Sequence, residues 1–125
     1  MKKILRSLGN LLLLLLLPAI LLFFFGFFAR TTDEYACAIQ TASQNPQVIA
    51  ATGEPVTAGL FAWTPYFESG GGLTQGAFNT AISGPNGRGS LHAEFFRSPV
   101  GSSLYLIFES GGEQAVLYDG AYPCG

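Results

Sequence analysis

Charged residues and metal-binding side chains are scarce in this chain of 125 residues. Only 11% of the residues are charged, His92 is the only histidine, and there are two cysteines. A structural zinc site is usually built from four Cys or His ligands, and the chain holds too few of these residues to form one. We therefore expect no metal site and no cofactor.

Basic residues are almost absent after Arg30, where only Arg88 and Arg97 remain. All eight acidic residues lie in this later part, so its formal charge is −6. Proteins bind nucleic acids through clustered Lys and Arg that displace counterions from the phosphates, and similar clusters hold proteins on anionic lipid surfaces. The charge balance argues against a nucleic-acid partner and against wide adhesion to anionic membranes.

Signatures of catalysis are missing as well. The chain has no Gly-x-Ser-x-Gly motif, which positions the nucleophile of many hydrolases. The glycine-rich segment 84–89 lacks the Gly-Lys-Ser/Thr ending of a phosphate-binding loop and precedes a predicted strand instead of a helix. His92 and Glu94 lie two residues apart and could form an acid–base pair or bind a metal, but such a strand pair is more often solvated surface. We expect no catalytic residue and interpret the protein as a non-enzyme.

One long apolar run stands out: the nineteen residues from Leu11 to Ala29 contain no charge. As a helix this run would be ~28 Å long at ~1.5 Å per residue, close to the ~30 Å apolar thickness of a bilayer. Pro18 is compatible with a membrane span, where proline usually causes a kink. The run therefore predicts a single transmembrane helix at 11–29.

The charges on either side of this run predict its orientation. Three basic residues precede it, and acidic residues follow it closely: Lys2, Lys3 and Arg6 before, Asp33 and Glu34 after. The positive-inside rule then predicts a cytoplasmic segment 1–10 and an exported domain 30–125 in the periplasm, anchored to the inner membrane. The alternative is a cleaved signal peptide, whose apolar region is usually shorter, ~7–15 residues. The nearest small-x-small triplet, 36–38, lies well beyond the run, and cleavage there would separate the two cysteines.

Cys37 and Cys124 lie near opposite ends of the predicted exported domain. Disulfides form and persist in oxidising compartments outside the cytoplasm. We predict a Cys37–Cys124 disulfide, with two free thiols or a metal pair as the alternatives. Closing so long a loop would stabilise the fold by roughly 4 kcal/mol if chain entropy dominates.

The predicted domain contains two short helices followed by five strands. Capping residues and proline predict helices near 33–44 and 46–52. Glycine-punctuated runs of aromatic and β-branched residues then predict the strands. These strands are 56–63, 73–82, 89–98, 104–109 and 114–118, with a loop over 64–72. The predicted fold class is α+β: an N-terminal transmembrane helix, then two short helices packed on one face of a mainly antiparallel sheet of about five strands.

The strongest local signal is a hairpin turn formed by Gly84, Pro85, Asn86, Gly87 and Gly89. Asn-Gly favours the positive φ angles of tight hairpin turns, and proline presets the chain one step earlier. The pentapeptide Phe-Glu-Ser-Gly-Gly occurs at 67–71 and again at 108–112. Because the flanking residues differ, we interpret it as turn chemistry at two strand ends and not as a duplication.

Alternation along the strands predicts which face of the sheet is covered. Leu91, Ala93 and Phe95 share one face and are expected to meet the helices. Aromatic and aliphatic side chains elsewhere give a candidate partner surface, which consists of Trp63, Phe96, Tyr105 and Ile107. Tyr66 and Phe67 could line a binding surface together with Trp63. The alternatives are that the C-terminal segment 121–123 folds over this face, or that Trp63 packs in the core or contacts membrane headgroups.

The order of features from Tyr35 to Tyr118 resembles the cytochrome oxidase complex assembly protein family, whose fold is similar to the intermembrane-space domain of a mitochondrial inner-membrane translocase subunit. The resemblance lies in the lead-in 48–56, which ends in Gly53-Glu54-Pro55-Val56, and in the strand–turn–strand segment 76–94, which contains Gly84-Pro85-Asn86-Gly87-Arg88-Gly89. It implies a non-catalytic, chaperone-like accessory factor that contacts an inner-membrane protein complex. The alternative is a stand-alone periplasmic domain that binds a small ligand or responds to envelope stress.

Overall fold

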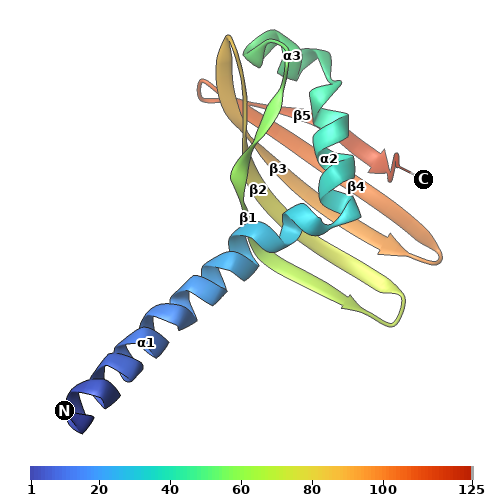
Figure 1. Ribbon diagram of the computed structural model, residues 1–125. Helices are drawn as coiled ribbons and strands as arrows, with labels where there is room; N and C mark the ends of the chain where they lie inside the picture. Colours follow the sequence, from blue (N-terminus) through green and yellow to red (C-terminus); the bar gives the residue numbers. More distant parts are fainter. Residues whose placement is uncertain (125) are drawn as a thin grey trace.

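The computed structural model describes residues 1–124, except for the side chain of Phe25, so Gly125 at the end of the predicted domain lies outside the described residues. A long helix projects away from a domain in which two helices lie against a five-stranded sheet (Figure 1). The α+β class and the number of strands predicted from the sequence are confirmed.

Helix α1 (Lys2–Phe27) contains most of the apolar run and continues into a short 3₁₀ helix, η1 (Phe28–Thr31). Its side chains from Leu11 to Phe24 are exposed, because α1 stands clear of the domain over this length. The segment Lys2–Phe24 contains an 18-residue stretch with a mean hydropathy of 2.4 and is long and apolar enough to cross a membrane, although a signal sequence would meet the same criteria. Such a helix is typical of a membrane anchor or a signal sequence.

The two short helices of the domain are α2 (Asp33–Ser43) and α3 (Pro46–Thr52). The Thr32 hydroxyl accepts a hydrogen bond from the Tyr35 backbone N–H at 3.2 Å and so caps the start of α2. Asn45 does the same for α3, where its side-chain oxygen accepts from the Gln47 N–H at 2.9 Å. Both helices are confirmed close to their predicted limits because these caps are readable in the sequence.

The strands are β1 (Thr57–Gly70), β2 (Leu73–Gly84), β3 (Gly87–Ser98), β4 (Gly101–Ser110) and β5 (Glu113–Ala121). They pair antiparallel in chain order, with β1 and β5 at the edges, and α2 and α3 cover one face (Figure 1). The prediction of a loop over 64–72 is wrong, because β1 continues to Gly70. β1 has two register shifts, one between Ala58 and Ala62 and one between Trp63 and Tyr66. The second accommodates Pro65, which lacks a backbone N–H and is tolerated at bulges of an edge strand.

The core lies between the two helices and the sheet. Its largest fully buried apolar side chains come from α3 and three strands: Val48, Phe78, Ile82, Leu91, Leu104 and Leu106. The Tyr35 ring of α2 lies 5.2 Å from that of Phe78, centroid to centroid. Leu91, Ala93 and Phe95 are buried among them, which confirms the predicted inner face of β3.

The predicted β2–β3 hairpin is present, but its glycines serve a different purpose from the one expected. Among residues 1–124 only five glycines have positive φ, and Gly87 is not one of them. Asn86 does not have positive φ either. Instead, a Cβ atom at Gly84 would lie 2.4 Å from the Thr52 carbonyl oxygen, and one at Gly87 would lie 2.5 Å from that of Ala51. The turn is glycine-rich because it packs directly against the end of α3.

Positive φ angles occur at the two turns that overlap the end of the repeated pentapeptide. The pairs Gly71-Gly72 and Gly111-Gly112 have φ of 61° and 81°, and of 61° and 82°, as expected for tight hairpin turns. Just before each turn, a glutamate accepts a hydrogen bond from a glutamine across the strands, at 2.8 Å for Gln75 to Glu68 and 3.4 Å for Gln114 to Glu109. The repeat is turn chemistry, as predicted.

Candidate functional site

The sheet surface turned away from α2 and α3, which we call the outer face, gathers the predicted partner residues. Strand pairing places Trp63, Asn79, His92 and Ile107 in one row across four strands. Glu94 pairs with Tyr105 in the next row, and Phe96 follows Glu94 by the two-residue alternation of a strand. The structure therefore brings Trp63, Phe96, Tyr105 and Ile107 onto one face.

Two further apolar side chains lie on the outer face: Tyr66, which the sequence analysis grouped with Trp63, and Val116, which it did not single out. Tyr66 is 47% exposed and Val116 is 56% exposed, and they pair with Ala77 and Ile107, respectively. Phe67, in contrast, packs against the core. Val116 was missed because its face depends on a register shift between β4 and β5. Ala77 is only 1% exposed, because its neighbours on this face have larger side chains.

A short chain of polar side chains crosses the middle of the outer face. His92 Nδ1 lies 2.8 Å from the Asn79 side-chain oxygen, and His92 Nε2 lies 3.2 Å from a Glu94 carboxylate oxygen. Because both ring nitrogens have partners, these contacts fix the orientation of the imidazole. Within residues 1–124, no group of three or more His, Cys, Asp or Glu is arranged to hold a metal ion.

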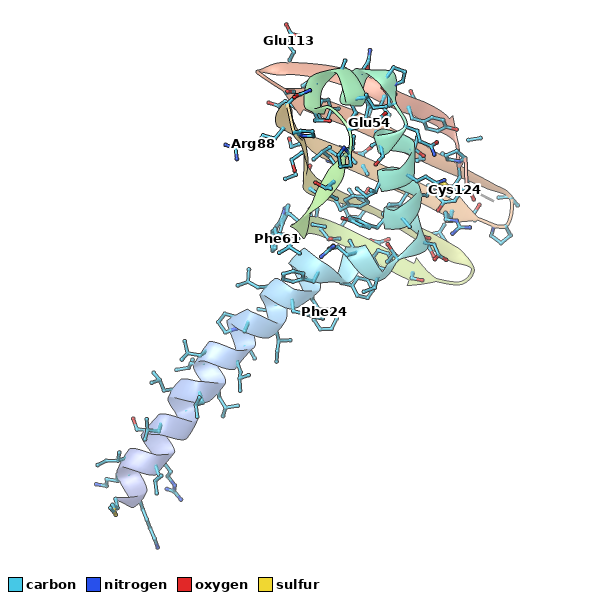
Figure 2. The ribbon with its side chains drawn as sticks, turned by 45° about the horizontal axis from the view of Figure 1, so that its top comes forward. Phe24, Glu54, Phe61, Arg88, Glu113 and Cys124 are labelled. Carbon is cyan, nitrogen blue, oxygen red and sulfur yellow. A yellow bond between two sulfur atoms is a disulfide. The ribbon has the colours of Figure 1, made fainter. Side chains whose placement is uncertain are left out.

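The C-terminal segment does not cover the outer face, so the expectation that 121–123 folds over it is wrong. Cys124 forms a disulfide with Cys37 of α2, with 5.8 Å between the Cα atoms, which draws the end of the chain to the helix side of the sheet (Figure 2). The predicted disulfide is thus present. A disulfide is typical of an extracytoplasmic domain in an oxidising compartment.

Arg97 holds the same segment on the helix side. Its Nη1 donates to a Glu34 carboxylate oxygen at 3.2 Å, and its guanidinium lies 4.4 Å from the centroid of the Tyr122 ring. The Tyr122 hydroxyl donates to the Asp33 carbonyl oxygen at 3.4 Å. Burial raises the pKa of Tyr122 above its ordinary value. Tyr122 is therefore built into the helix side of the domain and leaves the outer face open.

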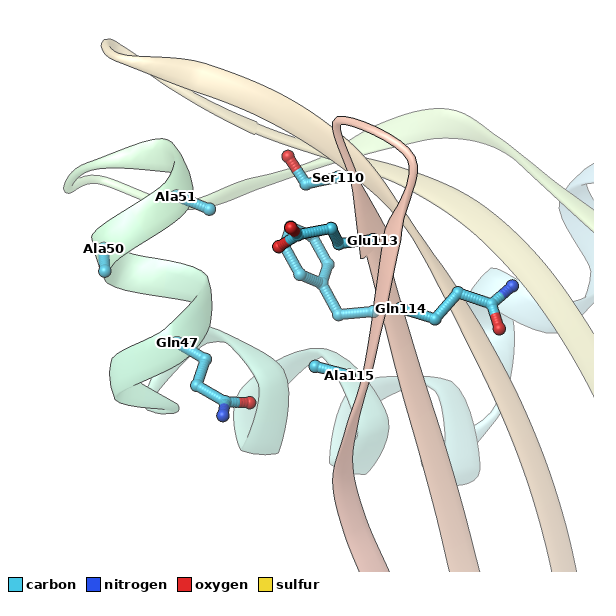
Figure 3. A pocket seen from close by; sticks show the side chains of 8 residues that line it. Gln47, Ala50, Ala51, Ser110, Glu113, Gln114 and Ala115 are labelled. Atoms are coloured by element: carbon cyan, nitrogen blue, oxygen red, sulfur yellow. The ribbon is translucent and has the colours of Figure 1, made fainter.

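Apart from the outer face, a groove lies between α3 and the β4–β5 hairpin and has a volume of about 470 Å³. Its lining consists of Gln47, Ala50, Ala51, Phe108, Ser110, Glu113, Gln114 and Ala115. Figure 3 shows Ala51, Ser110 and Glu113 facing the space between the helix and the hairpin, whereas Gln114 points away. Glu113 is the only charged residue of this lining, so the groove suits a small, largely neutral ligand.

Comparisons with known protein families, with characterised proteins and with solved structures find no match to this chain.

Proposed function

We propose that this protein is a membrane-anchored, non-catalytic accessory factor that helps to assemble an inner-membrane protein complex through contacts at its outer face. The observation that carries this proposal is the set of exposed or half-exposed apolar side chains on that face: Trp63, Tyr66, Phe96, Tyr105, Ile107 and Val116. Aromatic residues dominate the energetics of protein interfaces. The resemblance to cytochrome oxidase assembly proteins adds the class of partner.

The anchor in this proposal is α1, retained as a single span with its N-terminus in the cytoplasm and the domain in the periplasm. A span confines the domain to the membrane plane and so raises its effective concentration near membrane partners, even where the intrinsic affinity is modest. A topology reporter fused to the C-terminus tests this arrangement. Activity of the reporter only on the cytoplasmic side would overturn it.

The partner is tested by crosslinking in the native membrane. A photoreactive residue placed at Tyr105 or Ile107 of the full-length chain should form products with subunits of an inner-membrane complex, identified by mass spectrometry. The matched control is the same group at Gln40, which is exposed on α2. Recovery of no complex subunit above this control, together with unchanged oxidase activity in a deletion strain, would remove the proposal.

The groove between α3 and the β4–β5 hairpin supports a second candidate, a stand-alone domain that binds a small ligand. A thermal-shift screen with lipids, haem and peptides separates the two functions, because a ligand that binds only the folded state raises its stability. Under the second proposal, filling the groove with Ala51→Phe would abolish any ligand-specific shift. A screen without any such shift would favour the partner-binding proposal.

A further inference from the structure

Strand β1 carries an exposed apolar bulge at the point where α1 meets the domain. Ala58 pairs with Ile82 and Ala62 with Thr80, so three residues of β1 lie opposite Ala81 alone. A bulge of this kind bends its strand and re-aims its side chains. Here it leaves Leu60 75% exposed and Phe61 42% exposed.

This bulge is fixed to the end of α1 by close contacts. A Cβ atom at Gly26 would lie 1.9 Å from the Phe61 ring, so the missing side chain allows the ring to lie directly on the helix. The Phe27 and Phe61 rings meet edge to face at 6.0 Å, and Arg30 Nη1 donates to the Leu60 carbonyl oxygen at 3.2 Å. Figure 2 shows Phe24 and Phe61 at this junction.

A groove of about 390 Å³ lies between α1 and β1. Its lining is apolar except for one threonine and consists of Leu21, Phe24, Phe28, Thr64 and Phe67. The Phe28 and Phe67 rings, which join its two walls, lie 5.2 Å apart. The apolar surface of α1 is therefore continuous with the domain through both the groove and the bulge.

We propose that the β1 segment 60–66 lies in the outer interfacial region of the bilayer and that a phospholipid acyl chain occupies the groove between α1 and β1. This inference rests on the proposed membrane anchor. An acyl chain is the expected occupant because the apolar surface of α1, which would lie among acyl chains, continues directly to Leu60 and into the groove. Interfacial belts of membrane proteins are rich in Trp and Tyr, and Trp63 and Tyr66 are 45% and 47% exposed on the same strand.

The position of Arg30 agrees with this placement. Its exposed guanidinium lies at the end of the apolar helix and beside Leu60, at the level where lipid phosphates would lie. A guanidinium has five N–H donors in a planar fork that matches phosphate. One N–H of Arg30 can therefore donate to the Leu60 carbonyl oxygen while the others donate to a lipid phosphate.

As a consequence, the domain has a fixed orientation relative to the membrane. Figure 1 shows β1 running across the end of α1, and β1 is the edge of the sheet. With this edge on the bilayer, the sheet stands upright and the outer face opens sideways, toward other proteins in the membrane plane. A domain held only by a flexible tether would present that face in all directions.

Trp63, the only tryptophan of the chain, makes the inference directly measurable. The full-length protein is reconstituted in phosphatidylcholine vesicles whose acyl chains carry bromine, a fluorescence quencher, either near the headgroup or near the bilayer centre. We expect blue-shifted Trp63 emission that the shallow label quenches more strongly than the deep label. Leu60→Asp should remove most of this quenching, because it places a charge in the interface.

The control is Val100→Asp, which introduces the same charge at an exposed apolar residue of the β3–β4 turn and should leave the quenching unchanged. If the protein stays with the vesicles after an alkaline wash but neither label quenches Trp63, the inference is wrong and the anchor stands. Equal effects of the two variants would also overturn it. Release of the protein by the wash would overturn the anchor itself, and the lipid contact with it.

Discussion

Gly84 is one of the residues through which the β2–β3 turn touches the end of α3, and it gives the sharpest prediction about a single side chain. In Gly84→Ala the new Cβ would lie 2.4 Å from the Thr52 carbonyl oxygen and 2.5 Å from that of Gly53. Backbone atoms cannot rotate away, so the turn and α3 must separate. We expect a loss of about 1–3 kcal/mol in the free energy of unfolding, measured by thermal and urea denaturation of the full-length protein in detergent.

The matched control for this prediction is Gly101→Ala at the β3–β4 turn. A Cβ atom there has nothing within 4 Å, and Gly101 does not have positive φ. The two variants make the same chemical change, so only the Gly84 change should lower stability. Equal stabilities would show that the turn does not need the close approach.

Tyr122 makes stability depend on pH in the alkaline range. Burial raises the pKa of Tyr122 above the ordinary value of 10.0, despite the opposing effect of Arg97. As pH rises, the unfolded chain therefore loses the Tyr122 proton before the folded protein does. The stabilising contribution of Tyr122 is complete below pH 10 and declines as pH rises through the folded-state pKa. We expect the wild type to lose more stability above pH 10 than Tyr122→Phe, as measured by thermal unfolding over a pH series.

The control is Tyr105→Phe, a change at a tyrosine of the outer face. It should retain the alkaline loss that Tyr122→Phe lacks. A loss of the same size in all three proteins would mean that Tyr122 is not responsible.

At the scale of elements, the junction of α1 with β1 depends on the absence of a side chain at Gly26. Gly26→Leu would displace the Phe61 ring from the helix and loosen the bulge of β1. We expect a protease that cuts after aromatic residues to cleave β1 faster in this variant, because cleavage requires local opening. The cleavage rate is followed by mass spectrometry on the reconstituted protein.

Gly9→Leu provides the control within the same helix, since a Cβ at Gly9 has nothing within 4 Å. Its cleavage pattern should match that of the wild type. If Gly26→Leu also matched the wild type, Phe61 would not hold β1 on α1.

The elements also show how far sequence reasoning reaches. The helices and four of the five strands follow from local signals, namely caps, alternation and glycine turns. The end of β1 does not, because Pro65 and the glycines at 70–72 indicate a loop unless the two bulges are known. Bulges arise from strand pairing and packing, which a single strand does not encode. The same limit hid Val116, which lies beside a register shift.

The candidate site was predictable only in part, for a related reason. Alternation placed Phe96, Tyr105 and Ile107 on the face opposite the core residues, and pairing adds Trp63 to them. Glycine, however, is ambiguous in sequence, since positive φ and close approach both require it. At Asn86-Gly87 the sequence favoured the first reason, whereas the contact with α3 depends on the second.

At the scale of the whole molecule, the disulfide joins the end of the chain to α2, on the helix side of the sheet. Cys37 and Cys124 are 87 residues apart, so their bond restricts nearly the whole unfolded domain. Replacing both by serine should lower the free energy of unfolding by about 2–4 kcal/mol. The measurement is urea denaturation of the full-length protein, and a reducing agent should bring the wild type to the level of the variant without changing the variant itself.

The same variant tests whether the disulfide keeps the outer face clear. The Arg97–Tyr122 contact and the Tyr122 hydrogen bond to Asp33 also hold the C-terminal segment on the helix side, so we expect the segment to stay there without the disulfide. A photoreactive group at Ile107 should then give the same partner products in the variant, in lower amount only as far as less protein is folded. If those products disappeared from folded protein while the group became crosslinked to residues 121–124, the disulfide would be the element that holds this face open.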